Sequence, residues 1–177
     1  MSTYIALLRG VNVGGVILEM EDFRTILEYI GFQKIRIYIQ SGNAIFETND
    51  TSRKKMEAEI SYEIRSKIDK PVVAVLLTLE ELRSVVAAHP LASFGDPENL
   101  YVTVLAQEPG AADAAILLDT MNGVDTHEVV GRTVYSYYGE GYDKSRRTNN
   151  FIEKVLKISG TTRSWATMRA IVELASS

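Results

Sequence analysis

The spacing of apolar residues predicts strand, helix, strand and strand in the first fifty residues. The unbroken apolar run 4–8 is typical of a central strand. Apolar residues then recur at helical spacing up to Gly31, a residue that suits a helix C-terminus; they are Met20, Phe23, Ile26, Leu27 and Ile30. Alternation over 35–40 predicts a half-buried strand, and Ser41-Gly42 predicts a short hairpin into a strand over 43–47.

A second amphipathic helix and a fourth strand complete this pattern. The helix is marked by Met56, Ile60 and Ile64, and we expect Asp50 or Thr51 to cap it. The apolar run 71–77 predicts the strand. The resulting order, βαββαβ, is that of the ferredoxin-like fold, so the sequence predicts an α+β protein with antiparallel sheets.

This topology places two polar loops at one end of the first sheet. The loop after the first strand and the hairpin after the second both follow strands that run in the same direction. The first and third strands are neighbours in the ferredoxin-like order, about 5 Å apart. We therefore expect Arg9 and Asn12 to face Gln40, Ser41 and Asn43.

The rest of the chain repeats the same order of elements. A capping box at 78–81 opens a short helix, and 91–99 is the best linker candidate. A strand, a helix, a hairpin and another helix follow, at 100–106, 111–121, 126–138 and 150–158. At the end we expect Thr161 or Thr162 to cap a helix carrying Trp165, in place of a fourth strand. The expected organisation is an N-terminal ferredoxin-like subdomain at 1–78, a connecting helix and linker at 79–99, and a C-terminal α+β subdomain with C-terminal helices at 100–177.

Composition narrows the class of protein. The 177 residues, of which 46% are apolar, suffice for a substantial core, and no apolar run is long enough to span a membrane. The start of the chain shows no signal-peptide pattern, so we expect a cytoplasmic protein without a membrane partner. Cysteine is absent, which excludes disulfides, thiol nucleophiles and cysteine metal sites.

Charge is unevenly distributed. The net charge is −4, yet residues 132–170 contain eight bases against three acids. The run Lys144-Ser145-Arg146-Arg147 follows four tyrosines, at 135, 137, 138 and 142. Such a segment can bind single-stranded nucleic acid through base stacking and phosphate contacts. The ordinary alternative is a solvated basic loop that follows tyrosines packed within a sheet.

Three motifs together resemble a known bacterial family. They are Leu7-Leu8-Arg9-Gly10-Val11-Asn12-Val13-Gly14-Gly15, Tyr38-Ile39-Gln40-Ser41-Gly42-Asn43 and Thr161-Thr162-Arg163-Ser164-Trp165-Ala166-Thr167. In this combination and order they are similar to the family called domain of unknown function 1697. The resemblance implies an α+β fold of two ferredoxin-like halves and implies no activity. The chain departs from the family pattern at Val16-Ile17, where members carry lysine and asparagine, and at Ser164, where they carry asparagine.

The first motif is a candidate anion site. Glycines at 10, 14 and 15 allow the backbone to approach a phosphate at a helix start, although they serve a tight connection equally well. The motif is neither a P-loop nor a dinucleotide fingerprint. A guanidinium that ends an apolar strand, as at Arg9, must meet either a carboxylate or a ligand.

The other two motifs have equally ordinary alternatives. Gln40, Ser41 and Asn43 suit ligand binding, but serine, glycine and asparagine are also what a hairpin turn prefers. Thr162 and Arg163 are interpreted first as a helix cap. Alternatively, the helix N-terminus and the guanidinium form an anion site. The ligand-binding residues we predict are Arg9, Asn12, Gly14, Gly15, Gln40, Ser41, Asn43, Thr162 and Arg163.

No familiar catalytic constellation is found. We expect His89 and His127 to be surface or capping residues, and no metal-ligand spacing or nucleophile elbow occurs. We therefore predict no metal site and no cofactor, and the catalytic residues are unknown. The leading hypothesis is a protein that binds an anionic small molecule or nucleotide at the loop end of the first subdomain. The alternatives are a nucleic-acid-binding protein that uses the basic C-terminal region and an enzyme acting on a phosphorylated substrate.

Overall fold

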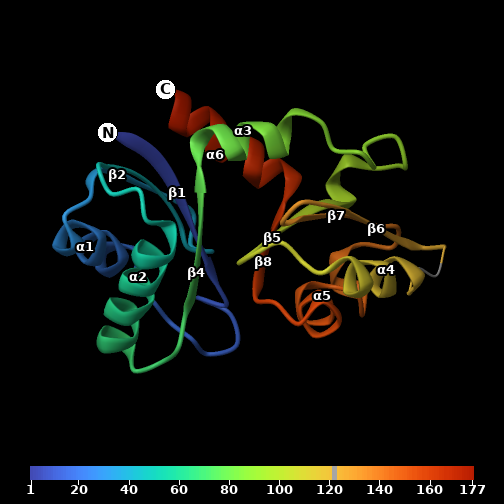
Figure 1. The fold of residues 1–177 in the computed structure, drawn as a ribbon, viewed down its shortest axis with the longest axis horizontal. Coiled ribbons are helices and arrows are strands. Elements are labelled where there is room, and N and C mark those ends of the chain that lie inside the picture. The colour runs from blue at the N-terminus through green and yellow to red at the C-terminus, as the bar shows by residue number, and fades with distance from the viewer. Residues whose placement is uncertain (121–122) are drawn as a thin grey trace. The chain divides into compact units, whose positions relative to one another are not determined.

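A computed structural model describes residues 1–120 and 123–177. The chain forms two compact units (Figure 1). Unit 1 contains residues 1–82 and 171–177, and unit 2 contains residues 83–170. The subdomain boundaries predicted at 78 and 99 stay a prediction.

Unit 1 is a βαββαβ fold, as predicted. Its four strands form an antiparallel sheet in the order β2-β3-β1-β4, so β1 and β3 are neighbours. Helix α3 (Leu79–Ala87) starts in this unit, and the last residues of α6 (Trp165–Ser176) belong to it. The other elements are β1 (Ser2–Arg9), α1 (Met20–Ile30), β2 (Gln33–Tyr38), β3 (Asn43–Thr48), α2 (Arg53–Ile68) and β4 (Val73–Thr78).

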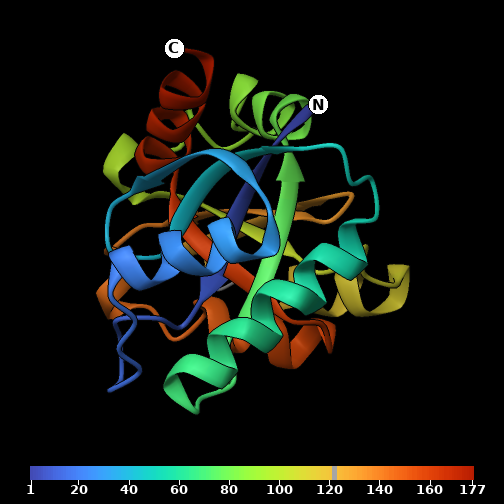
Figure 2. The ribbon, with the colours of Figure 1, turned by 90° about the vertical axis from the view of Figure 1, so that its left-hand side faces the viewer.

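The core of unit 1 lies between its sheet and two helices. In Figure 2, α1 and α2 cross in front of the strands, on one face of the sheet. Alternate residues of β1, among them Ala6 and Leu8, pack against buried residues of both helices, such as Phe23 and Ile60. Gly31 ends α1 in the left-handed conformation, with a φ of 102°, which confirms the role predicted for it.

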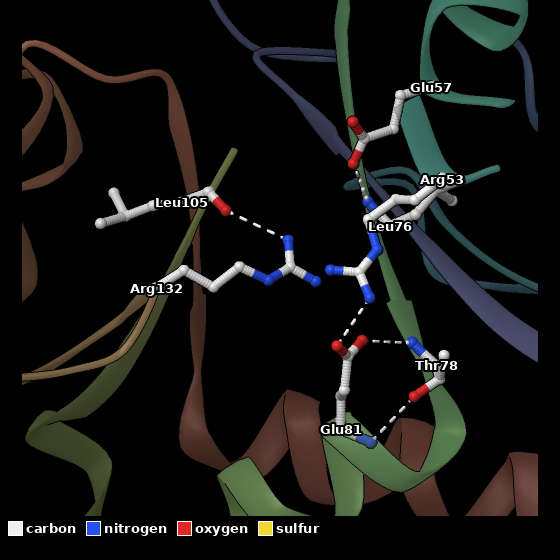
Figure 3. Close-up of polar contacts among 7 residues, drawn as sticks. All are labelled: Arg53, Glu57, Leu76, Thr78, Glu81, Leu105 and Arg132. Atoms are coloured by element: carbon white, nitrogen blue, oxygen red, sulfur yellow. Dashed lines mark hydrogen bonds and ion pairs between the residues drawn. The ribbon is translucent and has the colours of Figure 1, made fainter. Parts of the chain in front are cut away.

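Side chains satisfy the outer edge of β4. The Glu57 carboxylate on α2 accepts a hydrogen bond from the Leu76 N–H at 2.9 Å, and Ser61 Oγ accepts one from the Ala74 N–H at 3.3 Å. The next outward N–H, of Thr78, donates to Glu81 at 2.8 Å (Figure 3). These contacts occupy edge donors that an added strand would otherwise use.

The predicted capping box at the start of α3 is confirmed. Thr78 Oγ1 accepts from the Glu81 N–H at 3.1 Å, which reciprocates the bond from the Thr78 N–H to the Glu81 carboxylate. Glu81 also pairs with Arg53 at 2.6 Å (Figure 3). At α2 the prediction was wrong by a residue or two, because Ser52 is the N-cap, while Asp50 accepts from the Ser52 N–H at 2.9 Å.

Unit 2 repeats this architecture. Its antiparallel sheet has the order β6-β7-β5-β8, and Figure 1 shows α4 and α5 on one side of it. The β6–β7 hairpin turns at Gly131 and Arg132, as predicted, and Arg132 Nη1 donates to the Leu105 carbonyl at 3.2 Å (Figure 3). The elements are a short 3-10 turn (Pro97–Asn99), β5 (Leu100–Leu105), α4 (Ala111–Asp119), β6 (Asp125–Val130), β7 (Thr133–Tyr138), a second 3-10 turn (Tyr142–Lys144), α5 (Asn149–Leu156) and β8 (Gly160–Ser164).

The main correction to the predicted elements concerns β8. We expected Thr161 or Thr162 to cap the last helix, whereas Gly160–Ser164 is a strand that pairs antiparallel with β5. The helix starts after it, where Ser164 Oγ accepts from the Thr167 N–H at 3.1 Å. The second half therefore has its fourth strand and is a complete βαββαβ unit. The predicted helix over 111–121 was expected to stop at Asn122-Gly123, and residues 121 and 122 of this prediction lie outside the described residues.

Candidate anion-binding site

Asn12 organises the loop between β1 and α1. Its Oδ1 accepts from the Leu18 N–H at 3.1 Å, and its Nδ2 donates to the Leu18 carbonyl at 3.1 Å and to the Gln40 carbonyl at 2.7 Å. The Asn12 N–H donates to the Val16 carbonyl at 2.6 Å. One side chain thus holds the two ends of the loop together and ties them to the β2–β3 turn.

The β2–β3 turn packs directly on the end of β1. The Gly42 carbonyl accepts from the Leu8 N–H at 2.8 Å. Gly42 has a φ of 83°, and a Cβ placed there would lie 2.7 Å from Cγ2 of Val11. Asn43 closes the turn by donating to the Tyr38 carbonyl at 2.9 Å and to Ser41 Oγ at 2.8 Å.

The structure brings the two loops of unit 1 together, as their predicted topology requires. We expected the two asparagines to bind a ligand. Instead, the side-chain amides of Asn12 and Asn43 form hydrogen bonds to the backbone of these loops and to Ser41. They position the loops. The exposed residues of the two loops include Val13, Gly14, Gly15 and Gln40, and Arg9 at the end of β1 is half-buried.

Thr162 and Arg163 lie in unit 2, in the middle of β8. They pair with Thr103 and Val102 of β5, so neither belongs to a helix N-terminus. Thr162 Oγ1 donates to Asn149 Oδ1 at 2.8 Å and lies 2.7 Å from Thr103 Oγ1. The helix-cap form of the predicted site is therefore wrong.

Arg163 is a buried cation. Its side chain is only 8% exposed, and Nη1 donates to Thr161 Oγ1 at 2.6 Å and to the Thr162 carbonyl at 3.0 Å. Desolvation lowers the pKa of Arg163 to about 10, and the nearby Tyr142 opposes this shift. Because this pKa remains well above 7, the guanidinium is charged at neutral pH.

Both histidines are buried, which corrects the expectation of surface positions. His89 accepts from the Leu91 N–H at Nδ1, at 3.2 Å, so its Nε2 carries the proton and donates to the Tyr101 carbonyl at 3.0 Å. His127 Nδ1 lies 2.7 Å from Ser136 Oγ. Burial lowers the pKa of both rings, that of His127 to about 4, so both are neutral at pH 7.

Two of the three tyrosines of β7 pack within the unit and do not contribute to a stacking platform. Tyr135 and Tyr138 are buried, and their hydroxyls donate to the carbonyls of Val85 and Arg147 at 2.8 and 2.9 Å. Burial raises the pKa of Tyr138 well above its ordinary value. Tyr142 stacks on Tyr101, with ring centroids 4.6 Å apart. These contacts favour the packing alternative for this region.

One site was missed at the level of sequence. A pocket of about 190 Å³ in unit 2 is lined by Val124, Asp125, Glu140, Lys144, Ser145, Arg146 and Arg147. The basic run was visible in the sequence, but the part that Asp125 plays was not, because only folding brings this distant residue beside the run. Buried Asp125 accepts a hydrogen bond from Ser145 Oγ at 2.6 Å.

Metal binding and membrane insertion each require features that residues 1–120 and 123–177 do not show. No cluster of three or more histidine or acidic side chains suited to a metal ion occurs in them. No helix within the same ranges has the length and apolar character needed to cross a bilayer.

The architecture is that of an α+β protein built from two ferredoxin-like units. The sequence profile described as Protein of unknown function (DUF1697) matches residues 1–135, and the chain belongs to this family. A solved structure, the conserved bacterial protein SP0830 from Streptococcus pneumoniae, is similar to it with a TM-score of 0.74 and 20% sequence identity, over 100% of this chain and 99% of that one. This likeness supports the fold. The comparison with curated proteins gave no match.

Proposed function

We propose that this protein binds an anionic small molecule or nucleotide at the loop end of unit 1. The observation that supports this best is the bracing of a glycine-rich loop by Asn12, which forms hydrogen bonds to Leu18 and to Gln40. Gly10, Asn12, Gly14 and Gly15 all have positive φ, from 57° to 85°. Consecutive peptide N–H groups in such turns form concavities that suit anions.

The ligand groups in this proposal are the peptide units of Gly14 and Gly15 together with the Arg9 guanidinium. Arg9 ends β1 and is half-buried, where its charge is less screened than that of an exposed arginine. Asn12 and Asn43 hold the loops in place through the carbonyls of Gln40 and Tyr38 and through Ser41 Oγ. Arg163 lies in unit 2 and is proposed as a separate cationic site. Because this residue is buried, only a small anion can reach its guanidinium.

The test is a thermal-shift screen of the full chain with phosphate, pyrophosphate and mononucleotides. At least one of these is expected to raise the melting temperature, and R9A is expected to reduce the rise. The matched control is R65A, since Arg65 is an exposed arginine on α2 of the same unit. A screen with no shift, or an equal loss of shift in both variants, refutes the proposal.

The packing of the tyrosines weakens the case for a nucleic-acid-binding protein. Tyr135 and Tyr138 are buried and have their hydroxyls bonded within unit 2, so neither presents a free ring for base stacking. The third alternative, an enzyme acting on a phosphorylated substrate, requires the same binding site. The thermal-shift screen therefore tests the binding step of this alternative too.

A further inference from the structure

We propose that unit 2 contains a second, independent site for the phosphate group of a small phosphate ester, in the pocket formed by the segment Lys144–Arg147. Three basic side chains line this pocket, those of Lys144, Arg146 and Arg147. Its volume of about 190 Å³ is smaller than the roughly 300–1,000 Å³ of pockets that enclose a whole small molecule, which suits a phosphate group rather than a whole nucleotide.

The segment is held in one conformation, which an unstructured basic loop would not be. Ser145 Oγ donates to Asp125 at 2.6 Å and accepts from the Arg147 N–H at 2.9 Å. The Arg147 carbonyl in turn accepts from the hydroxyl of Tyr138, a fully buried side chain, at 2.9 Å. The backbone of the pocket is thus anchored on both sides of Arg147.

The guanidinium of Arg147 is positioned as well. Its Nε donates to the Thr120 carbonyl at 2.9 Å, and its Cζ lies 5.8 Å from the centre of the Phe151 ring. These contacts involve Nε and one face of the Arg147 guanidinium. Arginine binds phosphate oxygens through its paired N–H donors, and a lysine adds a point charge, so this pocket offers both kinds of contact.

Two carboxylates also line the pocket, and their surroundings differ. Asp125 is 5% exposed and is engaged by Ser145, so it serves the structure of the segment. Glu140 is exposed at the rim, where water screens its charge. A phosphate carries between one and two negative charges near neutral pH, so removal of the Glu140 charge should strengthen its binding.

The proposed occupant is a free phosphate ester rather than a nucleic-acid strand. The phosphate chemistry of the two is shared, but a single strand also needs exposed aromatic rings for its bases. Tyr135 and Tyr138 are buried. The experiment therefore compares inorganic phosphate and glycerol 3-phosphate with a short single-stranded oligonucleotide.

Binding is measured by titration followed by amide NMR shifts at low salt, with the full chain. We expect phosphate and the ester to shift the amide signals of Ser145 and Arg147, and R146A to weaken this binding about tenfold. E140Q should tighten it. The matched control is K154A, which removes one positive charge from an exposed position on α5 and should leave the affinity unchanged.

The outcomes separate this proposal from the one for unit 1. R9A should leave the shifts at Ser145 and Arg147 intact even where it weakens binding at the unit 1 loops. Equal weakening by R146A and K154A would show non-specific attraction and overturn the inference. Absence of any shift with phosphate and the ester, or a response to the oligonucleotide alone, overturns it too.

Discussion

At the scale of single residues, two glycines with the same sign of φ are expected to respond very differently to substitution. Gly42 has a φ of 83°, and an added Cβ would lie 2.7 Å from Val11 and 2.9 Å from Leu8. Gly14 has a φ of 60° and open space around it. G14A should cost about 1 kcal/mol of left-handed strain, whereas G42A adds a steric clash and should cost about 3 kcal/mol in total.

The measurement is urea unfolding of the two variants and the parent protein. The Gly14 variant is the control for backbone strain alone, so the difference between the two free energies of unfolding reports the close packing of the turn on β1. Equal losses would contradict the contact between Gly42 and Val11.

His127 should make the stability of the protein depend on pH. Burial lowers its pKa in the folded state from 6.5 to about 4, an effect that Arg147 reinforces and Asp125 opposes. The unfolded chain therefore binds more protons than the folded one between these values. The stabilisation is complete above about pH 6.5 and is lost as the pH falls towards 4. Preferential protonation of His127 in the unfolded chain should lower the free energy of unfolding by about 2 kcal/mol as the pH falls from about 7 to about 5.

Comparison with H127Q isolates the contribution of His127 from those of the other titratable groups. Glutamine carries no charge at either pH, so the slope of unfolding free energy against pH should become shallower in this window. His89, whose pKa burial also lowers, supplies the slope that remains. An unchanged slope in H127Q would mean that His127 is not the group that titrates.

Residue types alone did not reveal these roles. The sequence pattern correctly indicated that Asn12 and Asn43 lie in adjoining loops, because topology and strand order determine that. It did not indicate that their side-chain amides donate hydrogen bonds to the backbone of those loops. These bonds depend on the positions of the carbonyls of Leu18, Gln40 and Tyr38 in the folded chain. Burial of His127 was hidden for a similar reason, since polar residues in a strand are ordinarily expected at its exposed face.

At the scale of elements, both units protect the outer edge of their fourth strand in the same way. In unit 1, Glu57 of α2 accepts from the Leu76 N–H of β4 at 2.9 Å. In unit 2, Glu153 of α5 accepts from the Gly160 N–H of β8, also at 2.9 Å. In each case the glutamate comes from the second helix of the βαββαβ order. The repeat therefore extends from element order to a specific polar contact.

Removal of either carboxylate should destabilise its unit. E57A leaves the Leu76 N–H without this acceptor at a partly buried edge, and a loss of about 1–2 kcal/mol is expected. E57Q retains a carbonyl oxygen and should lose less. Chemical denaturation checks both, with E173A on the exposed face of α6 as the control. A similar loss in E57A and E173A would indicate a helix effect rather than edge protection.

The element that sequence reasoning missed is the short strand β8. Thr161-Thr162-Arg163-Ser164 has polar residues before an amphipathic helix, which is also the pattern of an N-cap. Threonine favours strands, but only the pairing of this segment with β5, some sixty residues earlier, decides between the two alternatives. The helices with strong apolar periodicity, such as α1, needed no such distant information.

At the scale of the whole molecule, the two units are not consecutive pieces of chain. The chain leaves unit 1 after Leu82 and returns to it at Ile171, within α6. The repeated order of elements in the sequence predicted two similar folds. It did not predict that residues 171–177 belong to unit 1. The final residues of the chain are anchored by Arg36 of β2, whose guanidinium donates to the carbonyls of Leu174 and Ala175.

This anchor predicts that the end of α6 contributes to the stability of unit 1. Arg36 also donates to Ser177 Oγ at 3.1 Å, and its positive charge lies at the negative end of the helix dipole. R36M, which keeps the aliphatic stem, should lower the free energy of unfolding by about 2 kcal/mol and the melting temperature by about 4–8 °C. Deletion of residues 174–177 should give a similar loss, and R36M should then add little in the truncated chain. Additive losses in calorimetry would instead show that Arg36 stabilises β2 independently of the helix end.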